Sequence, residues 1–157
     1  MSGFLGLDFT QKGLALYTIP ATWLLSLLPH AYSGLASGDN LDPAYPRTLT
    51  ENLGRDQKMD KRKKQRIIRA VAAEANTVET LGVVAGAVVA ATAAGADPQL
   101  TNLLSFGILA VRAAYIYVYV VLQEDRNMAP VRSIIWTVNM LGVISLYIIA
   151  ARALAAA

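Results

Sequence analysis

The chain has 157 residues, of which 55% are hydrophobic and only 16% are charged, and its formal net charge is +3. A small soluble domain has too little interior to hide so much apolar surface, so the composition excludes an ordinary water-soluble enzyme and a disordered chain. The chain contains no cysteine and a single histidine, His30, which excludes disulfides, cysteine-type zinc sites and multi-histidine metal sites. A small membrane protein with several spanning segments remains.

Four stretches reach the roughly 20 mostly apolar residues that a membrane-spanning helix needs: residues 13–37, 66–94, 98–122 and 130–154. Only the first connection, about residues 38–65, is long. The short later connections make neighbouring helices antiparallel. We therefore expect an all-α integral membrane protein, with residues 1–157 forming one four-helix bundle.

Basic residues predict the orientation of this bundle. Nine of the 14 Lys and Arg residues lie within residues 47–69. The positive-inside rule then places the first and third connections in the cytosol and both termini in the lumen or outside. We interpret the basic run as a topology signal that touches anionic lipid head groups, and not as a nucleic-acid site, because no nucleic-acid-binding motif accompanies it. The expected membrane is the endoplasmic reticulum for a eukaryotic source and the inner membrane for a bacterial one.

Three ionisable residues, Glu74, Glu79 and Arg112, interrupt the apolar segments, where charges are expensive and usually functional. At 1.5 Å per residue, Glu79 and Arg112 both lie about 15 Å from the cytosolic edge. The equal depth predicts an ion pair between them, which either locks two helices together or contacts a ligand. We expect Glu74 to reach water and His30 to be an interfacial residue.

Polar residues also follow stripes at helical spacing on three of the segments. The stripes are Arg69, Asn76 and Glu79 on the second segment, Arg112, Tyr115 and Tyr119 on the third, and Arg132, Trp136 and Asn139, with Ser133 adjacent, on the fourth. They predict a pocket open to the cytosolic leaflet for a charged, peptide-like ligand beside a lipid-dissolved molecule. Gly82 and Gly86 form a GxxxG pattern suited to close helix contact.

The sequence resembles the MAPEG family, the membrane-associated proteins in eicosanoid and glutathione metabolism. Residues 69–79, RAVAAEANTVE, are similar to its R-A-x-x-A-x-x-N-x-x-E signature. Residues 129–133, APVRS, resemble the A-P-x-R-S opening of prostaglandin E synthase-type members, and residues 39–47 resemble the first loop of fungal and bacterial relatives.

The resemblance implies a homotrimer that binds glutathione between adjacent subunits. It implies that Arg132 stabilises the glutathione thiolate and that the Ser133 hydroxyl assists. The implied glutathione-binding set is Arg69, Asn76, Glu79, Arg112, Tyr115, Tyr119 and Trp136. Ala72 stands where many animal members carry an arginine, and Ala75 stands where some members carry a basic residue. Glu74 stands where His or Gln is common, and Trp136 where several members have a tyrosine. Each departure removes a possible donor to glutathione.

We expect an enzyme, a membrane-bound glutathione-dependent transferase, peroxidase or isomerase acting on a lipophilic small-molecule substrate at the cytosolic face. Two alternatives stay open. The chain could be a MAPEG-fold enzyme that cyclises or isomerises a lipophilic natural product without glutathione, or a non-catalytic lipid-binding scaffold.

Overall fold

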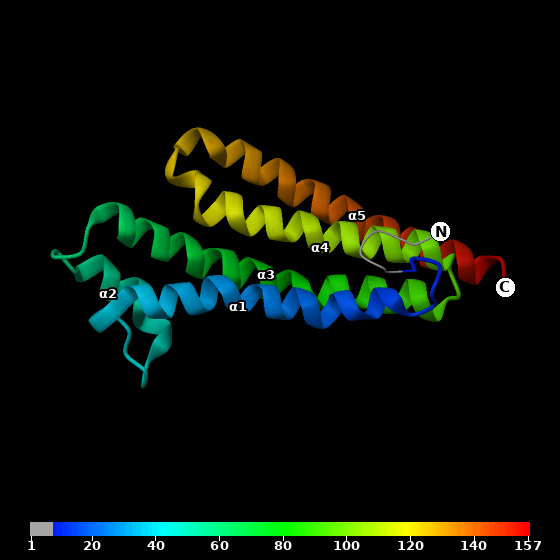
Figure 1. The fold of residues 1–157 in the computed structure, drawn as a ribbon, viewed down its shortest axis with the longest axis horizontal. Helices are drawn as coiled ribbons and strands as arrows, with labels where there is room; N and C mark the ends of the chain where they lie inside the picture. Colours follow the sequence, from blue (N-terminus) through cyan, green and yellow to red (C-terminus); the bar gives the residue numbers. More distant parts are fainter. Residues whose placement is uncertain (1–7) are drawn as a thin grey trace.

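A computed structural model describes residues 8–157. Four long helices make up an elongated bundle: α1 (Thr18–Ser37), α3 (Lys61–Ala93), α4 (Pro98–Val120) and α5 (Ala129–Ala155). All four are long and apolar enough to cross a membrane, as the sequence predicts, and the described residues contain no strand. The start of α1 and the C-terminus lie at one end of the bundle, here called the termini end; the first and third connections lie at the other, the loop end (Figure 1).

Side-chain caps set where two of these helices begin. The Asp60 carboxylate accepts the backbone N–H of Lys63 at 3.0 Å, so α3 starts at Lys61, five residues before the expected boundary at 66. Asp97 caps α4 in the same way through Leu100 N–H at 2.8 Å, and Pro98 occupies the first helical position.

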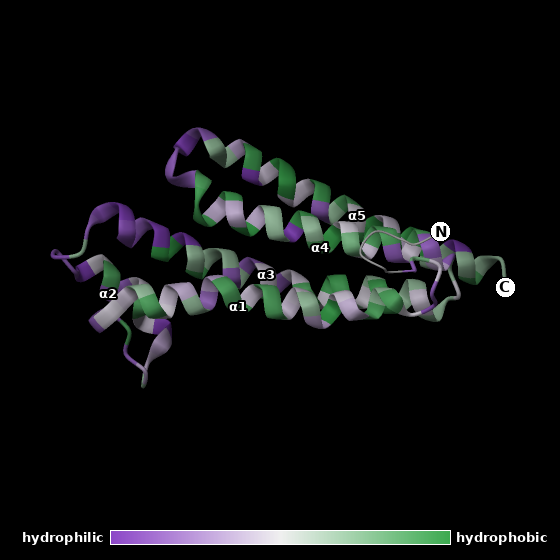
Figure 2. Cartoon of the chain, in the orientation of Figure 1, coloured by the Kyte–Doolittle hydropathy of each residue, from purple (hydrophilic) through white to green (hydrophobic). Residues whose placement is uncertain are grey.

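The helices pack as two antiparallel pairs, α1 with α3 and α4 with α5, and α3 also contacts α4 and α5. Small residues of α3 allow close approach in the core at the termini end, which contains Val84, Ala87, Val88, Ala91, Ile108, Val143 and Leu146. A second core cluster nearer the loop end contains Ala70, Ala73, Tyr115, Ile116 and Val120. Many large hydrophobic side chains of the helices are exposed, and hydrophilic residues gather at the loop end (Figure 2).

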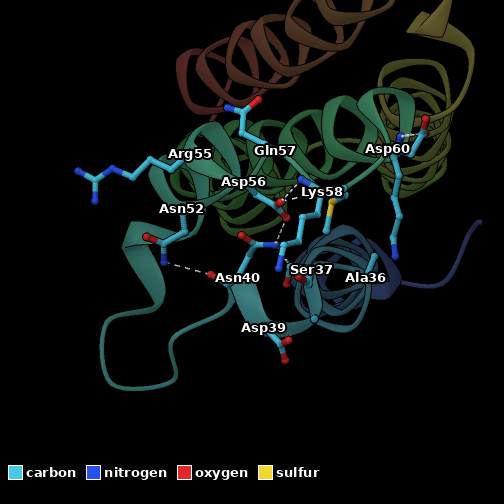
Figure 3. A pocket seen from close by; sticks show the side chains of 13 residues that line it. Ala36, Ser37, Asp39, Asn40, Asn52, Arg55, Asp56, Gln57, Lys58 and Asp60 are labelled. Carbon is cyan, nitrogen blue, oxygen red and sulfur yellow. Dashed lines mark hydrogen bonds between the residues drawn. The ribbon is translucent and has the colours of Figure 1, made fainter.

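The first connection is folded and not a plain loop. It contains α2 (Leu49–Arg55), and Leu49 and Leu53 pack on Ile67 of α3. The Asp56 carboxylate organises the connection by accepting from Asn40 Nδ2 at 2.8 Å and from the backbone N–H of Lys58 at 2.6 Å (Figure 3). These hydrogen bonds, the one from Asn40 foremost, hold the pKa of Asp56 below its ordinary value.

Candidate functional site

A cavity of about 690 Å³ opens between α3, α4 and α5 in the loop-end half of the bundle. We call it the α5 cavity. Its wall contains Asn76, Glu79, Tyr115, Tyr119, Arg132, Ser133 and Trp136, which the sequence singled out, together with Ala72, Ala75 and Thr137. The structure thus brings together seven of the nine site residues expected from the sequence, because each helix turns its polar stripe toward the same space.

Aromatic rings hold the one cation of this wall. The Arg132 guanidinium lies 4.6 Å from the centre of the Tyr119 ring, a cation–π contact. Tyr119 in turn meets Tyr115 edge to face, with 5.7 Å between ring centres. Arg132 forms no ion pair within residues 8–157, so its N–H donors remain available to a ligand.

Arg112 lies behind the cavity wall and is only 1% exposed. Its guanidinium donates to Asn76 Oδ1 at 2.9 Å, to Thr80 Oγ1 at 2.9 Å and to Asn139 Oδ1 at 2.8 Å. The predicted ion pair with Glu79 is therefore wrong. Equal depth fixes only one coordinate, and rotation about the α3 axis turns Asn76 and Thr80, not Glu79, toward Arg112.

This network orients Asn76 in the cavity wall. Because the oxygen of Asn76 accepts from Arg112, the amide nitrogen of Asn76 is left as a donor for the cavity. The exposed Glu79 carboxylate lies beside it and forms no ion pair among the described residues. The wall thus offers one cation, one anion and one amide donor within a partly aromatic surface.

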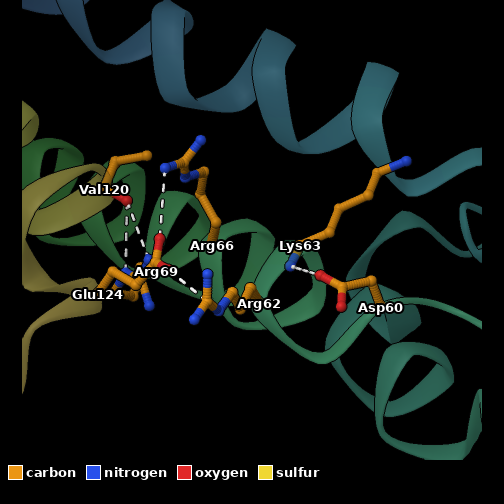
Figure 4. Close-up of polar contacts among 7 residues, drawn as sticks. All are labelled: Asp60, Arg62, Lys63, Arg66, Arg69, Val120 and Glu124. Carbon is orange, nitrogen blue, oxygen red and sulfur yellow. Dashed lines mark hydrogen bonds and ion pairs between the residues drawn. The ribbon is translucent and has the colours of Figure 1, made fainter.

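Arg69 lies outside the α5 cavity, although it shares a helical stripe with Asn76. Its Nε and Nη2 donate to the carbonyl oxygen of Val120 at 3.4 and 3.2 Å (Figure 4). A cation at the last carbonyls of α4 is favoured by the helix dipole. Arg69 therefore ties α3 to the end of α4, and its place does not match the expected glutathione contact.

The family model of the MAPEG family matches residues 14–152, nearly the whole chain. The chain belongs to the MAPEG family. No curated protein and no solved structure gives a significant match. Membership makes membrane-bound, glutathione-related transferase, isomerase or peroxidase chemistry the general activity of its relatives, and MAPEG proteins are typically trimers.

Two positions of this MAPEG chain weaken the match between cavity and glutathione. Ala72 and Ala75 stand at positions where basic residues occur in other members of the family, and both line the α5 cavity. Their methyl groups give the wall no hydrogen-bond donor at those points. Arg132 is consequently the only guanidinium in the lining.

The structure also reveals a pair that sequence reasoning missed. His30 Nδ1 of α1 lies 2.9 Å from Glu74 Oε1 of α3, and both line a separate cavity of about 420 Å³ under residues 41–50. The only signal in the sequence is that both residues are polar within apolar segments; the pairing itself depends on how α1 packs against α3.

Proposed function

We propose that this MAPEG protein is a glutathione-dependent transferase, peroxidase or isomerase that acts on a lipophilic substrate at the loop-end face of the membrane. One observation carries the proposal: a cation, a carboxylate, an amide and two phenols from three helices surround a single cavity. Its volume of about 690 Å³ falls within the roughly 300–1,000 Å³ typical of small-molecule sites.

The donor set fits the charges of glutathione, which has two carboxylates, one ammonium group and one thiol. Glu79 accepts from the ammonium group, and the Asn76 amide donates to a carboxylate. Arg132 faces the thiol, because a nearby guanidinium favours the thiolate. With one guanidinium for three anionic groups, we expect weak binding, in the upper micromolar to millimolar range.

When bound, glutathione supplies a sulfur nucleophile, and the residues of the chain prepare its surroundings. Arg132 stabilises negative charge on sulfur, and the Tyr119 ring holds the guanidinium in place. Ser133 and Trp136 line the same cavity. Holding the thiolate next to a substrate from the lipid makes the reaction effectively unimolecular, which is the main catalytic gain available here.

The assembly and orientation belong to the same proposal. Glu79 is an exposed carboxylate within a spanning helix, which is costly against lipid. A homotrimer, in which a neighbouring subunit covers this face, removes that cost. The positive-inside rule supports a cytosolic loop end, where glutathione is dissolved. The APVRS opening of α5 supports a place near prostaglandin E synthase-type members, and residues 39–47 support a fungal or bacterial branch.

The alanines in the cavity wall favour a second candidate. Ala72 and Ala75 give the α5 cavity no hydrogen-bond donors at these two points. The cavity therefore suits an uncharged lipophilic molecule better than it would with basic residues there. In this reading the chain isomerises or cyclises a natural product through Glu79, Tyr115 and Tyr119, or holds a lipid without turnover.

Titration calorimetry of glutathione into the detergent-purified full chain tests the proposal, with Arg132→Ala beside the wild type. We expect measurable binding by the wild type and a loss of tenfold or more in Arg132→Ala, since a charge-assisted hydrogen bond contributes about 1.5–3 kcal/mol and about 1.4 kcal/mol is tenfold in affinity. Arg152→Ala, at the termini end of the same helix, is the matched control and leaves affinity unchanged.

No heat from the wild type at millimolar glutathione contradicts glutathione use and favours a substrate that reacts alone. Equal losses in Arg132→Ala and Arg152→Ala contradict the assignment of the thiolate site to Arg132. Turnover of a lipophilic electrophile, with kcat lowered in Arg132→Ala, then separates an enzyme from a lipid-binding scaffold.

A further inference from the structure

Hydroxyl groups from four residues line the α5 cavity, and they differ in what they can donate. The Ser133 hydroxyl donates to the carbonyl oxygen of Ala129 at 3.2 Å, and the Thr137 hydroxyl donates to that of Ser133 at 3.0 Å. A hydroxyl has a single hydrogen, so both side chains of α5 direct their proton into their own helix. The phenols of Tyr115 and Tyr119 on α4 form no hydrogen bond among residues 8–157, which leaves their protons for a ligand.

Tyr115 is the more enclosed of these two phenols. It is only 4% exposed, because Tyr119 meets its ring edge to face and the Arg112 guanidinium lies 5.2 Å from its ring centre. Its oxygen is nevertheless open to the cavity. Among the described residues, the side-chain polar atoms that are both sealed from solvent and unpaired belong to Thr101 and Gln123, not to Tyr115. A buried ring therefore presents an unused O–H group to the cavity that it lines.

Such a hydroxyl is suited to negative charge on a bound molecule. A tyrosine phenol carries its proton at neutral pH, so it donates to an anion. Two guanidinium groups lie beside the pair of phenols: that of Arg112 at the Tyr115 ring, and that of Arg132 at 4.6 Å from the centre of the Tyr119 ring. Their positive charge lowers the energy of an oxyanion in contact with the phenol, and of the phenolate once the proton has moved.

We propose that the Tyr115 hydroxyl is the proton donor to the lipophilic substrate, an inference that rests on the proposed glutathione chemistry. The thiolate attacks a carbon that carries an oxygen leaving group, as in an epoxide. The S–C bond forms, and the C–O bond breaks with its electron pair moving to oxygen. That oxygen takes the Tyr115 proton, and water then returns to the phenolate the proton that the thiol released when it ionised.

Two electrophiles with the same ring test this role in the full, detergent-purified chain. A thiolate attacks both styrene oxide and benzyl chloride at a saturated carbon, but only the alkoxide from styrene oxide needs a proton, since chloride is stable as an anion. The measurement is kcat/KM for each electrophile at a fixed, high glutathione concentration. Tyr115→Phe is expected to lower kcat/KM about hundredfold for styrene oxide and less than about threefold for benzyl chloride, because a general acid contributes about 10²–10⁴-fold.

Two further tyrosines of α4 supply the matched variants. Tyr117 is 57% exposed and lies outside the cavity wall, so Tyr117→Phe is expected to leave both reactions unchanged. Tyr119→Phe keeps the ring that contacts Arg132 and is expected to leave the ratio between the two electrophiles unchanged. Turnover of benzyl chloride by Tyr115→Phe also shows that this variant is folded and still uses glutathione.

Equal losses of both reactions in Tyr115→Phe would overturn the role, since Tyr115 would then only bind glutathione or support the fold. A loss confined to styrene oxide in Tyr119→Phe, and absent in Tyr115→Phe, would overturn it in favour of the other phenol. Wild-type turnover of neither electrophile would overturn the proposed function together with this role. Turnover of both with an unchanged ratio in Tyr115→Phe would overturn this role alone.

Discussion

Two buried polar networks, at opposite ends of the bundle, use similar side chains for different purposes. At the termini end, Asn102 accepts from Ala15 N–H at 2.8 Å and donates to the carbonyls of Phe9 and Gln11 at 2.7 and 2.9 Å. All its partners are backbone groups, and the network is neutral and closed. It holds the segment before α1 against α4.

The Arg112 network in the other half is charged and bonds to side chains, one of which, Asn76, lines the α5 cavity. A buried guanidinium with neutral partners only is a costly choice for a purely structural link. The first network therefore stabilises the fold, whereas the second also sets the chemistry of a cavity wall.

Replacing the two central residues by leucine separates these roles and has the largest expected effect. Arg112→Leu leaves Asn76 Oδ1 and Asn139 Oδ1 without their donor, and Asn102→Leu leaves Ala15 N–H and two carbonyls unpaired. Each change lowers the free energy of unfolding by about 2–5 kcal/mol, measured as thermal stability in detergent. Only Arg112→Leu also weakens glutathione binding, about tenfold, because Asn76 loses its orientation.

Arg112→Lys is the companion variant. Lysine keeps the charge but lacks the planar guanidinium group that reaches three partners at once. It is expected to recover part of the stability and little of the affinity. Unchanged glutathione affinity in stable Arg112→Leu protein would contradict the positioning role and make the two networks equivalent.

A smaller effect is expected from the packing between these networks. A methyl group at Gly86 would lie 2.6 Å from the Tyr147 hydroxyl, which donates to the Val83 carbonyl at 3.1 Å. Gly86→Ala therefore displaces Tyr147 and disrupts its hydrogen bond, so its effect on the free energy of unfolding is about 1 kcal/mol less favourable in the wild type than in Tyr147→Phe protein. In Tyr147→Phe protein the same change is neutral or stabilising, because alanine favours helix by about 1 kcal/mol. A double-mutant cycle on thermal stability measures this coupling.

Gly82→Ala is the control from the same GxxxG pattern, since nothing within the described chain lies within 4 Å of the added methyl group. It should leave stability unchanged or raise it. A loss on Gly82→Ala would indicate that another chain packs against this part of α3. Equal effects of Gly86→Ala in both backgrounds would contradict the contact with Tyr147.

The sequence predicts the four spanning helices well because the lipid leaves little choice. A backbone in hydrocarbon must satisfy its own hydrogen bonds, so each apolar run of about 20 residues becomes a helix. The start of α3 was missed because it depends on the Asp60 cap, and α2 was missed because it depends on the packing of Leu49 and Leu53 on Ile67, neither of which hydropathy registers.

Part of the candidate site is predictable for a similar reason. Positions within one helix have a fixed phase, so Tyr115 and Tyr119 share a face in the structure as they do in the sequence. The rotation of one helix against another is not encoded in a single stripe. That freedom explains why Arg112 contacts Asn76 and not Glu79, and why the His30–Glu74 pair, 44 residues apart, was missed.

The smallest expected effect concerns Asp56, which caps backbone N–H groups as Asn102 does but at the exposed loop end. Its pKa is held below the ordinary value of 3.8 by Asn40 and by the N–H groups of Lys58 and Met59. A depressed pKa in the folded protein means that the ionised carboxylate stabilises the connection above pH 3.8, and that this stabilisation is lost as the pH falls through the folded pKa.

Hydrogen exchange of residues 38–60 therefore rises below about pH 3.8, after correction for intrinsic rates, while α3–α5 stay protected. Asp56→Ala shows the faster exchange already at pH 6, whereas Asp39→Ala, an exposed acid of the same connection, does not. If both acid and Asp56→Ala also removed the protection of α3, exposed Asp56 would be as important to the bundle as buried Asn102. Burial would then no longer explain the difference between the two ends.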